Sequence, residues 1–259
     1  GYSGGGIQCG WTAALKKSYA PEINSVGWYT GGTPSNLTAL VEKINGGPFA
    51  GYIAGGLGGV ISTYPDVKKY TDKVFTKQAQ KDLDFPKKHC QGDITSHFHF
   101  KNFYDKSFST VGKRFLYEPV IQNTLNELTM GVNPEFTPDT PVLMVHGISD
   151  EVAPYEAAHT TYKSWCKNGA DVEFVNFANP VSAHGVTTVT SSVPGFLWIR
   201  DRLQGKPVQS GCREIKNYDV GINSHALGED FESALGLLKG LLGDKIGPND
   251  EYLKDALHK

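Results

Sequence analysis

Three residues that could together cleave an ester bond occur along the sequence in the order serine, aspartate, histidine. Ser3 lies in GYSGG, which matches G-x-S-x-G, a pattern whose small residues let a serine occupy a strained turn between a strand and a helix. Asp150 follows in HGISDEVAPY and His184 in NPVSAHGV. A serine hydroxyl attacks a carbonyl carbon when an imidazole takes its proton and a carboxylate orients that imidazole. The three residues therefore indicate a nucleophile, an acid and a base for acyl transfer.

Each of these positions also has a purely structural interpretation. A chain with 30 glycines produces the five-residue pattern by chance about one time in five. Asp150 would equally suit a turn or the N-cap of the helix that follows it, and a loop histidine is more often structural than catalytic. His225 is the rival base. Because the order of the residues and their places after later strands fit one active site, we expect Ser3, Asp150 and His184 to converge.

The serine turn also predicts part of an oxyanion hole. The backbone N–H of Gly4 would donate one hydrogen bond from a helix N-terminus, and the second donor normally comes from a loop earlier in the chain. Only Gly1 and Tyr2 precede Ser3, although such a turn must follow a strand. We therefore expect a fragment that lacks the first strands of its own sheet.

Alternating helical and strand patterns surround the three residues. Apolar side chains recur at helical spacing or form short apolar runs between turn residues. The chain therefore predicts helices over 4–20, 155–168, 186–203 and about 231–242, and strands over 25–29, 142–145 and 172–177. Strands that alternate with helices form a parallel sheet covered by helices, which is an α/β fold. Asp150 and His184 would then stand on loops that follow two strands, where ligands bind in such sheets.

Between residues 36 and 135 the sequence no longer alternates between helical and strand patterns. Helical patches, Gly-rich apolar stretches and aromatic loops predict an inserted, mostly helical cap or lid. We expect four parts in all: core over 1–35, cap over 36–135, core over 136–212, and a C-terminal flap and tail over 213–259. A set of apolar cap residues would line an acyl channel or form the core of the cap, and the two interpretations stand equal: Phe49, Tyr52, Ile53, Leu57, Val60 and Ile61.

Composition excludes several other classes of protein. The 25 basic and 27 acidic residues form no long run of like charge, so a nucleic-acid partner is not expected. No apolar stretch approaches the roughly 20 residues of a membrane-spanning helix. No phosphate-binding loop or dinucleotide fingerprint follows a predicted strand, and no cysteine and histidine cluster has metal-ligand spacing, so neither a cofactor nor a metal is expected. The four cysteines would be disulfides or buried thiols.

Taken together, GYSGGG with the following GWTAAL, the YAPEI turn, the TGGTP loop, HGISDEVAPY and SAHG resemble the fungal secretory lipases, the family of the secreted Candida lipases and lipase A. The resemblance covers roughly residues 1–212. It implies an α/β-hydrolase core, a helical cap inserted after the nucleophile region and a C-terminal flap near the active-site entrance. It also implies that Ser3, Asp150 and His184 form the catalytic triad.

The same resemblance assigns the cysteines. It implies that Cys166 pairs with Cys212 and that Cys90 pairs with a cysteine in the missing amino-terminal part, whereas Cys9 stands where a small residue without a thiol is expected. Secretion follows from the resemblance, and the sequon at Asn36, a possible glycosylation site, is compatible with it.

The function that the resemblance implies is that of a secreted serine lipase, and we expect it to be a monomer that needs no cofactor. It would hydrolyse triacylglycerols and other carboxylic esters at a lipid–water interface through an acyl-enzyme intermediate. A short-chain esterase or acyltransferase is a related alternative, which the sequence does not separate from a lipase. A hydrolase-like module without catalysis is the alternative of another class, and it would be favoured if the three residues failed to converge.

Overall fold

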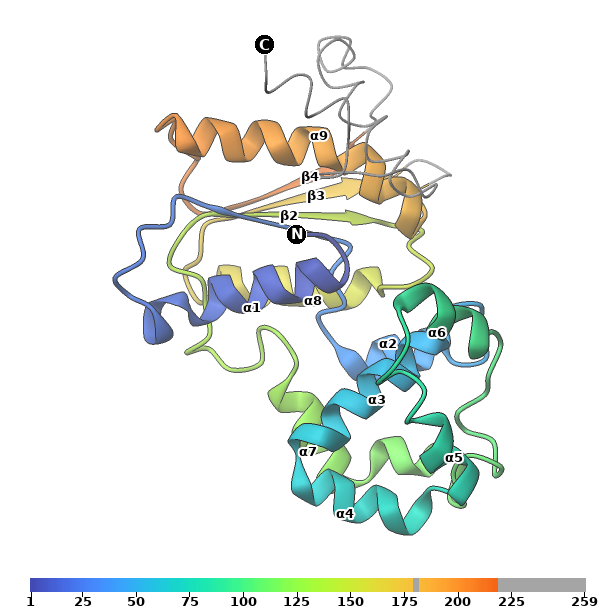
Figure 1. The fold of residues 1–259 in the computed structure, drawn as a ribbon. Coiled ribbons are helices and arrows are strands. Elements are labelled where there is room, and N and C mark those ends of the chain that lie inside the picture. Colours follow the sequence, from blue (N-terminus) through green and yellow to red (C-terminus); the bar gives the residue numbers. More distant parts are fainter. Residues whose placement is uncertain (179–181, 219–259) are drawn as a thin grey trace, which may run out of the picture.

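The computed structural model describes residues 1–178 and 182–218. Its centre is a parallel sheet whose described strands run in the order β1 (Trp28–Gly31), β2 (Val142–Gly147), β3 (Val172–Phe177) and β4 (Cys212–Tyr218). Figure 1 shows two helices on one face of the sheet, α1 (Gly4–Tyr19) and α8 (Tyr155–Lys167), and α9 (His184–Leu203) on the other. The predicted parallel sheet covered by helices is thus present.

Burial explains why the central strands form where they do. All six residues of β2 are buried, and five of the six in β3 are, so helices cover both faces of both strands. Strand β2 opens with the apolar run Val142–Val145, and β3 is mostly apolar but includes Glu173 and Asn176. Val142 lies opposite Trp28 on one side and opposite Val172 on the other. This register brings the carboxyl ends of β2 and β3 together, and the loops that follow them carry Asp150 and His184.

Several predicted boundaries differ from the structure: β1 ends at Gly31 rather than Tyr29, and β2 ends at Gly147 rather than Val145. Strand β1 begins at Trp28 rather than Ser25, because pairing starts where the Trp28 N–H donates to the Pro141 carbonyl. Helix α9 begins at His184 itself, so this histidine is the first residue of a helix and not part of the loop before it. The first helical hydrogen bond runs from the Thr187 N–H to the Ala183 carbonyl and fixes that start.

The sheet also continues past residue 212, where the sequence predicted a flap and tail over 213–259. Strand β4 pairs in parallel with β3, with Cys212 opposite Val172, and Arg213 forms an ion pair of 2.6 Å with Glu173 on β3. The described sheet therefore extends beyond residue 212. His225, the helix predicted near 231–242 and the rest of 219–259 lie outside the described residues.

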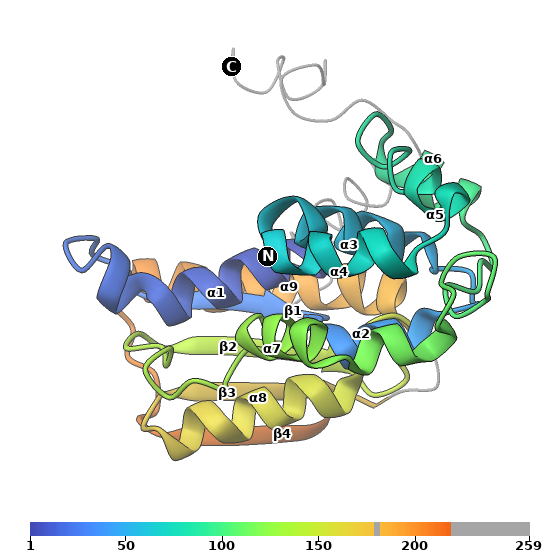
Figure 2. The same cartoon turned by 90° about the horizontal axis from the view of Figure 1, so that it is seen from below.

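The segment between β1 and β2 folds into short helices with a hydrophobic cluster of its own. Its centre is aromatic, with Phe98, Phe103, Phe108 and Phe115 almost fully buried. Figures 1 and 2 show these helices gathered on the side of the sheet that carries α1 and α8, toward the arrowhead ends of the strands. They are α2 (Leu37–Ile44), α3 (Gly51–Thr63), α4 (Pro65–Val74), α5 (Lys77–Asp82), α6 (Gln91–His97), the 3₁₀ helix η1 (Gly112–Tyr117) and α7 (Pro119–Glu127).

A disulfide fastens the outer strand to this framework. Cys166, in the last turn of α8, is bonded to Cys212 at the start of β4, which is the pair that the family resemblance implies. Cys9 is half-buried and Cys90 is exposed, and neither is in a disulfide within the described residues. None of the described helices is long and apolar enough to cross a membrane.

Candidate active site

Ser3 occupies a strained turn between a short strand pairing and helix α1. Its φ of 55° and ψ of −117° lie in a region that non-glycine residues rarely adopt. Tyr2 pairs in parallel with Gly31 of β1, and the Ser3 N–H donates to the Gly31 carbonyl at 2.8 Å. A Cβ on Gly1 would lie 2.3 Å from the Gly5 carbonyl oxygen, which explains the glycine two residues before the serine. The geometry is therefore that of a sharp strand-to-helix elbow.

The N-terminus of α1 lies directly beside this serine. The Ser3 side chain does not cap the helix, and the first intrahelical bond runs from the Ile7 N–H to the Ser3 carbonyl. The earliest N–H groups of a helix have no intrahelical partner, and Gly4, the first helical residue, is exposed. The Gly4 N–H is thus placed where a helix N-terminus can stabilise negative charge.

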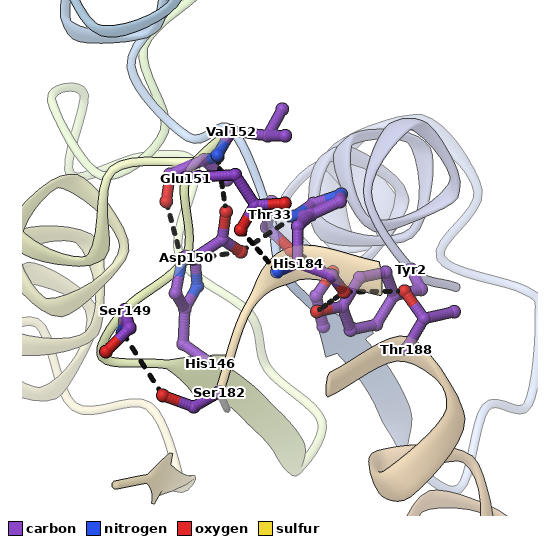
Figure 3. Close-up of polar contacts among 12 residues, drawn as sticks. Tyr2, Thr33, His146, Ser149, Asp150, Glu151, Val152, Ser182, His184 and Thr188 are labelled. Atoms are coloured by element: carbon purple, nitrogen blue, oxygen red, sulfur yellow. Dashed lines mark hydrogen bonds and ion pairs between the residues drawn. The ribbon is translucent and has the colours of Figure 1, made fainter. Parts of the chain in front are cut away.

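Asp150 is a buried carboxylate on the loop after β2. Its residue is 1% exposed, and Oδ1 accepts hydrogen bonds from the backbone N–H groups of Val152 at 2.9 Å and Ala153 at 2.7 Å. The other oxygen, Oδ2, lies 2.7 Å from Nδ1 of His184 (Figure 3). A carboxylate oxygen accepts, so Nδ1 donates in that bond and Nε2 is the ring nitrogen left to act as a base.

His184 is held by its main chain as well as by its ring. Its N–H donates to Glu151 Oε2 at 2.8 Å, and its carbonyl accepts from the Tyr2 hydroxyl at 3.0 Å. The rings of Tyr2 and His184 are 5.2 Å apart between centroids. Within the described residues no hydrogen bond joins the Ser3 hydroxyl to the His184 ring. The structure therefore joins Asp150 to His184 directly and brings the Ser3 segment to His184 through Tyr2.

A second histidine lies beside the acid. His146 is 1% exposed, and its Nε2 lies 3.0 Å from the Ala153 carbonyl oxygen and 3.6 Å from Asp150 Oδ2. Burial lowers the pKa of His146, although the nearby Asp150 carboxylate acts in the opposite direction. A neutral His146 that donates to Ala153 fixes the loop whose N–H groups hold Asp150.

Sequence reasoning did not single out Tyr2 or Glu151. Tyr2 is the variable residue of the G-x-S-x-G pattern, and Glu151 directly follows the acid, so adjacency to a candidate residue was the signal available. Burial raises the pKa of the Tyr2 hydroxyl, and the charge of Asp150 raises it further. Tyr2 is therefore a protonated hydrogen-bond donor at any physiological pH.

The six apolar residues considered for an acyl channel pack in the cap cluster. Ile53 is 3% exposed, and the other five are partly buried against the same cluster. Only Ile61 also lines a cavity of about 190 Å³ between α3 and α4, together with Phe75 and Leu83. This packing favours the cap-core interpretation for the set Phe49, Tyr52, Ile53, Leu57, Val60 and Ile61.

Asn36 has a structural role in the described chain. Its Oδ1 accepts a hydrogen bond from the Ala39 N–H at 3.0 Å, which caps the N-terminus of α2. A glycan would attach to the amide nitrogen and not to the capping oxygen, so the two roles are compatible. Glycosylation of Asn36 stays a prediction.

Comparison with known proteins places this geometry in a family. The sequence profile of the family described as secretory lipase matches residues 1–211. The chain belongs to the secretory lipase family. A secreted triacylglycerol lipase of Malassezia globosa is 91% identical over the whole chain, and one of Malassezia furfur is 40% identical over 98% of it. The chain spans 57% and 52% of the lengths of these two secretory lipases, about half of each.

Solved structures place the fold of this chain among the α/β hydrolases. Lipase A of Candida antarctica superposes with a TM-score of 0.80 at 28% identity, over 96% of this chain and 59% of that one. The esterase LipA of Xanthomonas oryzae, described as degrading rice cell walls, superposes with a TM-score of 0.63 over 80% of this chain and 58% of that one. At 18% identity the second likeness concerns the fold alone.

Proposed function

We propose that this chain carries the catalytic triad of a secreted triacylglycerol lipase, with Ser3 as nucleophile, His184 as base and Asp150 as acid. The observation that carries the proposal is the buried Asp150–His184 pair, whose Oδ2 and Nδ1 atoms are 2.7 Å apart beside the elbow that holds Ser3 in strained backbone. Buried carboxylates that orient an imidazole next to such a serine are the arrangement that acyl transfer needs. The names of the Malassezia relatives support the substrate class.

The proposed reaction has two halves. The Ser3 Oγ attacks the ester carbonyl carbon while His184 Nε2 takes the hydroxyl proton, and the resulting imidazolium is stabilised by the Asp150 carboxylate. The Gly4 N–H donates to the oxyanion of the tetrahedral intermediate. Collapse breaks the ester C–O bond as His184 returns the proton to the leaving alcohol, which leaves an acyl group on Ser3. Water then attacks the acyl-enzyme with His184 as base and releases the fatty acid.

The arrangement of parts follows from the same proposal. Residues 1–35 and the segment from 136 through β4 form the catalytic core, and residues 36–135 form a cap beside the site. Val152, two residues after Asp150, is 2% exposed and belongs to the hydrophobic cluster of the cap, so cap and acid loop are packed together. The Cys166–Cys212 disulfide supports export, since disulfides persist in oxidising compartments.

Hydrolysis of p-nitrophenyl esters by the full-length protein, compared with its Ser3→Ala variant, tests the proposal. Both proteins are first shown to be folded by circular dichroism. We expect the variant to lose activity by a factor of about 10⁴ or more, because the nucleophile is removed. Higher kcat/KM on long acyl chains than on short ones would support a lipase. Unchanged activity of the variant would overturn the triad, and an inactive parent would favour the non-catalytic alternative.

A further inference from the structure

Two residues outside the proposed triad form hydrogen bonds with the main chain of His184, one with its N–H and the other with its carbonyl. Glu151 accepts the His184 N–H at 2.8 Å, and Tyr2 donates its hydroxyl proton to the His184 carbonyl at 3.0 Å. Figure 3 shows the two side chains reaching His184 from different elements. Tyr2 directly precedes Ser3, and Glu151 directly follows Asp150. The neighbour of the nucleophile and the neighbour of the acid thus both bind the backbone of the base.

The Glu151 carboxylate accepts a backbone N–H that has no acceptor within helix α9. Because His184 is the first residue of α9, its N–H has no partner inside the helix. Ala183, at the N-cap, has no side chain that could accept this bond. The Glu151 carboxylate supplies both the acceptor and a negative charge at the positive end of the helix, and both stabilise the first turn of α9.

The Tyr2 contact comes from a side chain that has little room to move. A Cβ added to Gly31 or Gly32 would lie 2.5 Å from the Tyr2 ring, so β1 and the turn after it leave space for that ring only because they carry glycines. Burial and the charge of Asp150 raise the pKa of the Tyr2 hydroxyl, which keeps it a donor. Because its ring is closely packed and its hydroxyl stays protonated, Tyr2 can hold the His184 carbonyl in one position.

We propose that Tyr2 and Glu151 are positioning residues that set the His184 imidazole between Ser3 and Asp150, an inference that rests on the proposed function. The bond from Nδ1 to Asp150 orients the ring, and within α9 the His184 carbonyl also accepts the Thr188 hydroxyl at 2.9 Å. The contacts from Tyr2 and Glu151 come from outside α9, so they fix this end of the helix and tie the base to the segments that carry its two partners. Displacing a reacting group by about 1 Å costs as much as 10²-fold in rate, so such a clamp acts on kcat.

Substitution of Glu151 separates positioning from general stability. In the full-length protein, Glu151→Ala removes the acceptor, and we expect kcat to fall about tenfold with KM within about twofold. Glu151→Gln keeps an acceptor oxygen and should restore kcat to within about threefold of the parent. The matched control is Asp171→Ala, because Asp171 is another carboxylate that accepts a backbone N–H, from Gly211 at 2.5 Å, away from His184. We expect kcat of that control to stay within about twofold.

Tyr2→Phe completes the test, because it deletes only the hydroxyl and leaves the ring that packs on β1. We expect about a fivefold loss in kcat with KM within about twofold. Parental kcat in both Glu151→Ala and Tyr2→Phe would overturn the clamp, and so would equal losses in Glu151→Gln and Glu151→Ala. Ser3→Ala, measured in parallel, separates the two hypotheses: if it abolishes activity while the clamp variants keep the parental kcat, only the clamp fails, and if it keeps activity, the proposed function fails.

Discussion

The acid loop after β2 and the helical cap are stabilised in different ways. Around Asp150, buried polar groups satisfy one another, and both carboxylate oxygens are engaged, by two backbone N–H groups and by His184. The cap instead has an aromatic centre and a surface of exposed ion pairs, such as Lys68–Asp72. A buried polar network tolerates no missing partner, whereas a hydrophobic cluster loses stability in proportion to the volume removed. Activity and stability should therefore respond to different residues.

The largest expected effect is on activity and lies in the acid loop. Asp150→Asn keeps the size of the side chain but replaces an acceptor with an amide that can also donate, which favours the wrong tautomer of His184. We expect kcat/KM to fall by about 10³–10⁴-fold, with the melting temperature lowered far less than in the cap variants described below. Ester hydrolysis measures the change in kcat/KM, and thermal unfolding of the same preparation measures the change in melting temperature. A loss below about tenfold would contradict the assignment of the acid.

Next comes an effect on stability that belongs to the cap. Phe103 is fully buried in the aromatic cluster. Phe103→Ala should lower the free energy of unfolding by about 3–5 kcal/mol and leave kcat of the folded enzyme within about threefold. Urea unfolding and kinetics below the transition measure the two effects. If the variant does not fold, Phe103→Leu should cost roughly 1 kcal/mol. A tenfold fall in kcat of folded Phe103→Leu would contradict the claim that the cap core affects stability and the acid loop affects activity.

Val152 belongs to both regions and should show both effects. Its N–H holds Asp150, and its side chain is buried in the cap cluster. Val152→Ala should cost about 2 kcal/mol in unfolding free energy and lower kcat severalfold, because the loop loses its anchor in the cap. The matched control is Val67→Ala, a valine of the same cluster that is 1% exposed, which should lose similar stability without a change in kcat. Equal kcat values for the two variants would show that the cap does not position the acid.

The pH dependence of stability sharpens the comparison at His146. Burial lowers the pKa of His146 below its ordinary 6.5, so below about pH 6.5 the unfolded chain binds a proton that the folded chain does not. The contribution of neutral His146 to the free energy of unfolding is therefore fully present above about pH 6.5. It is lost as the pH falls, by up to about 1.4 kcal/mol per pH unit, until the pKa of His146 in the folded state is reached. Urea unfolding from pH 7 to 5 should show a steeper loss for the parent than for His146→Gln. If the free energy of unfolding changes with pH in the same way in both proteins, His146 does not contribute to the pH dependence of stability.

The smallest effect is expected at the surface of the cap. Lys68 and Asp72 form an ion pair of 2.6 Å one helical turn apart, with both side chains at least half exposed. Solvent and salt screen such pairs, so Lys68→Ala should change the free energy of unfolding by less than about 0.5 kcal/mol and leave kcat unaltered. Urea unfolding resolves a larger change. A cost above about 1 kcal/mol would mean that ion pairs stabilise the cap more than its packing suggests.

The sequence predicted the inner strands better than the outer one. The strand over Val172–Phe177 has the predicted bounds, because a short segment dominated by valine and phenylalanine between turn residues favours a buried strand. Strand β4 was missed, since Arg213, Glu214 and Lys216 make an outer strand that resembles a polar loop. Its place depends on pairing with β3 and on the disulfide at Cys212, and neither follows from local pattern.

The site was predictable in its residue types and order, and less so in its geometry. The start of α9 at His184 was missed because Ala183 is not a capping side chain and Gly185 is a poor helix former. The acceptor that replaces the cap is Glu151, 33 residues earlier in the chain. Contacts of this kind arise only when the carboxyl ends of β2 and β3 meet, so no local signal encodes them.

The most direct test of the central claim is to trap the nucleophile. The full-length protein is incubated with a p-nitrophenyl alkylphosphonate, which transfers its phosphonyl group to an activated serine and releases p-nitrophenol. The modified residue is then identified by peptide mass spectrometry. The account predicts loss of activity in step with one label per chain, carried by the peptide that contains Ser3, and no label on Ser3→Ala or on denatured protein. Inactivation with the label on a different residue, or full activity with Ser3 labelled, would contradict it.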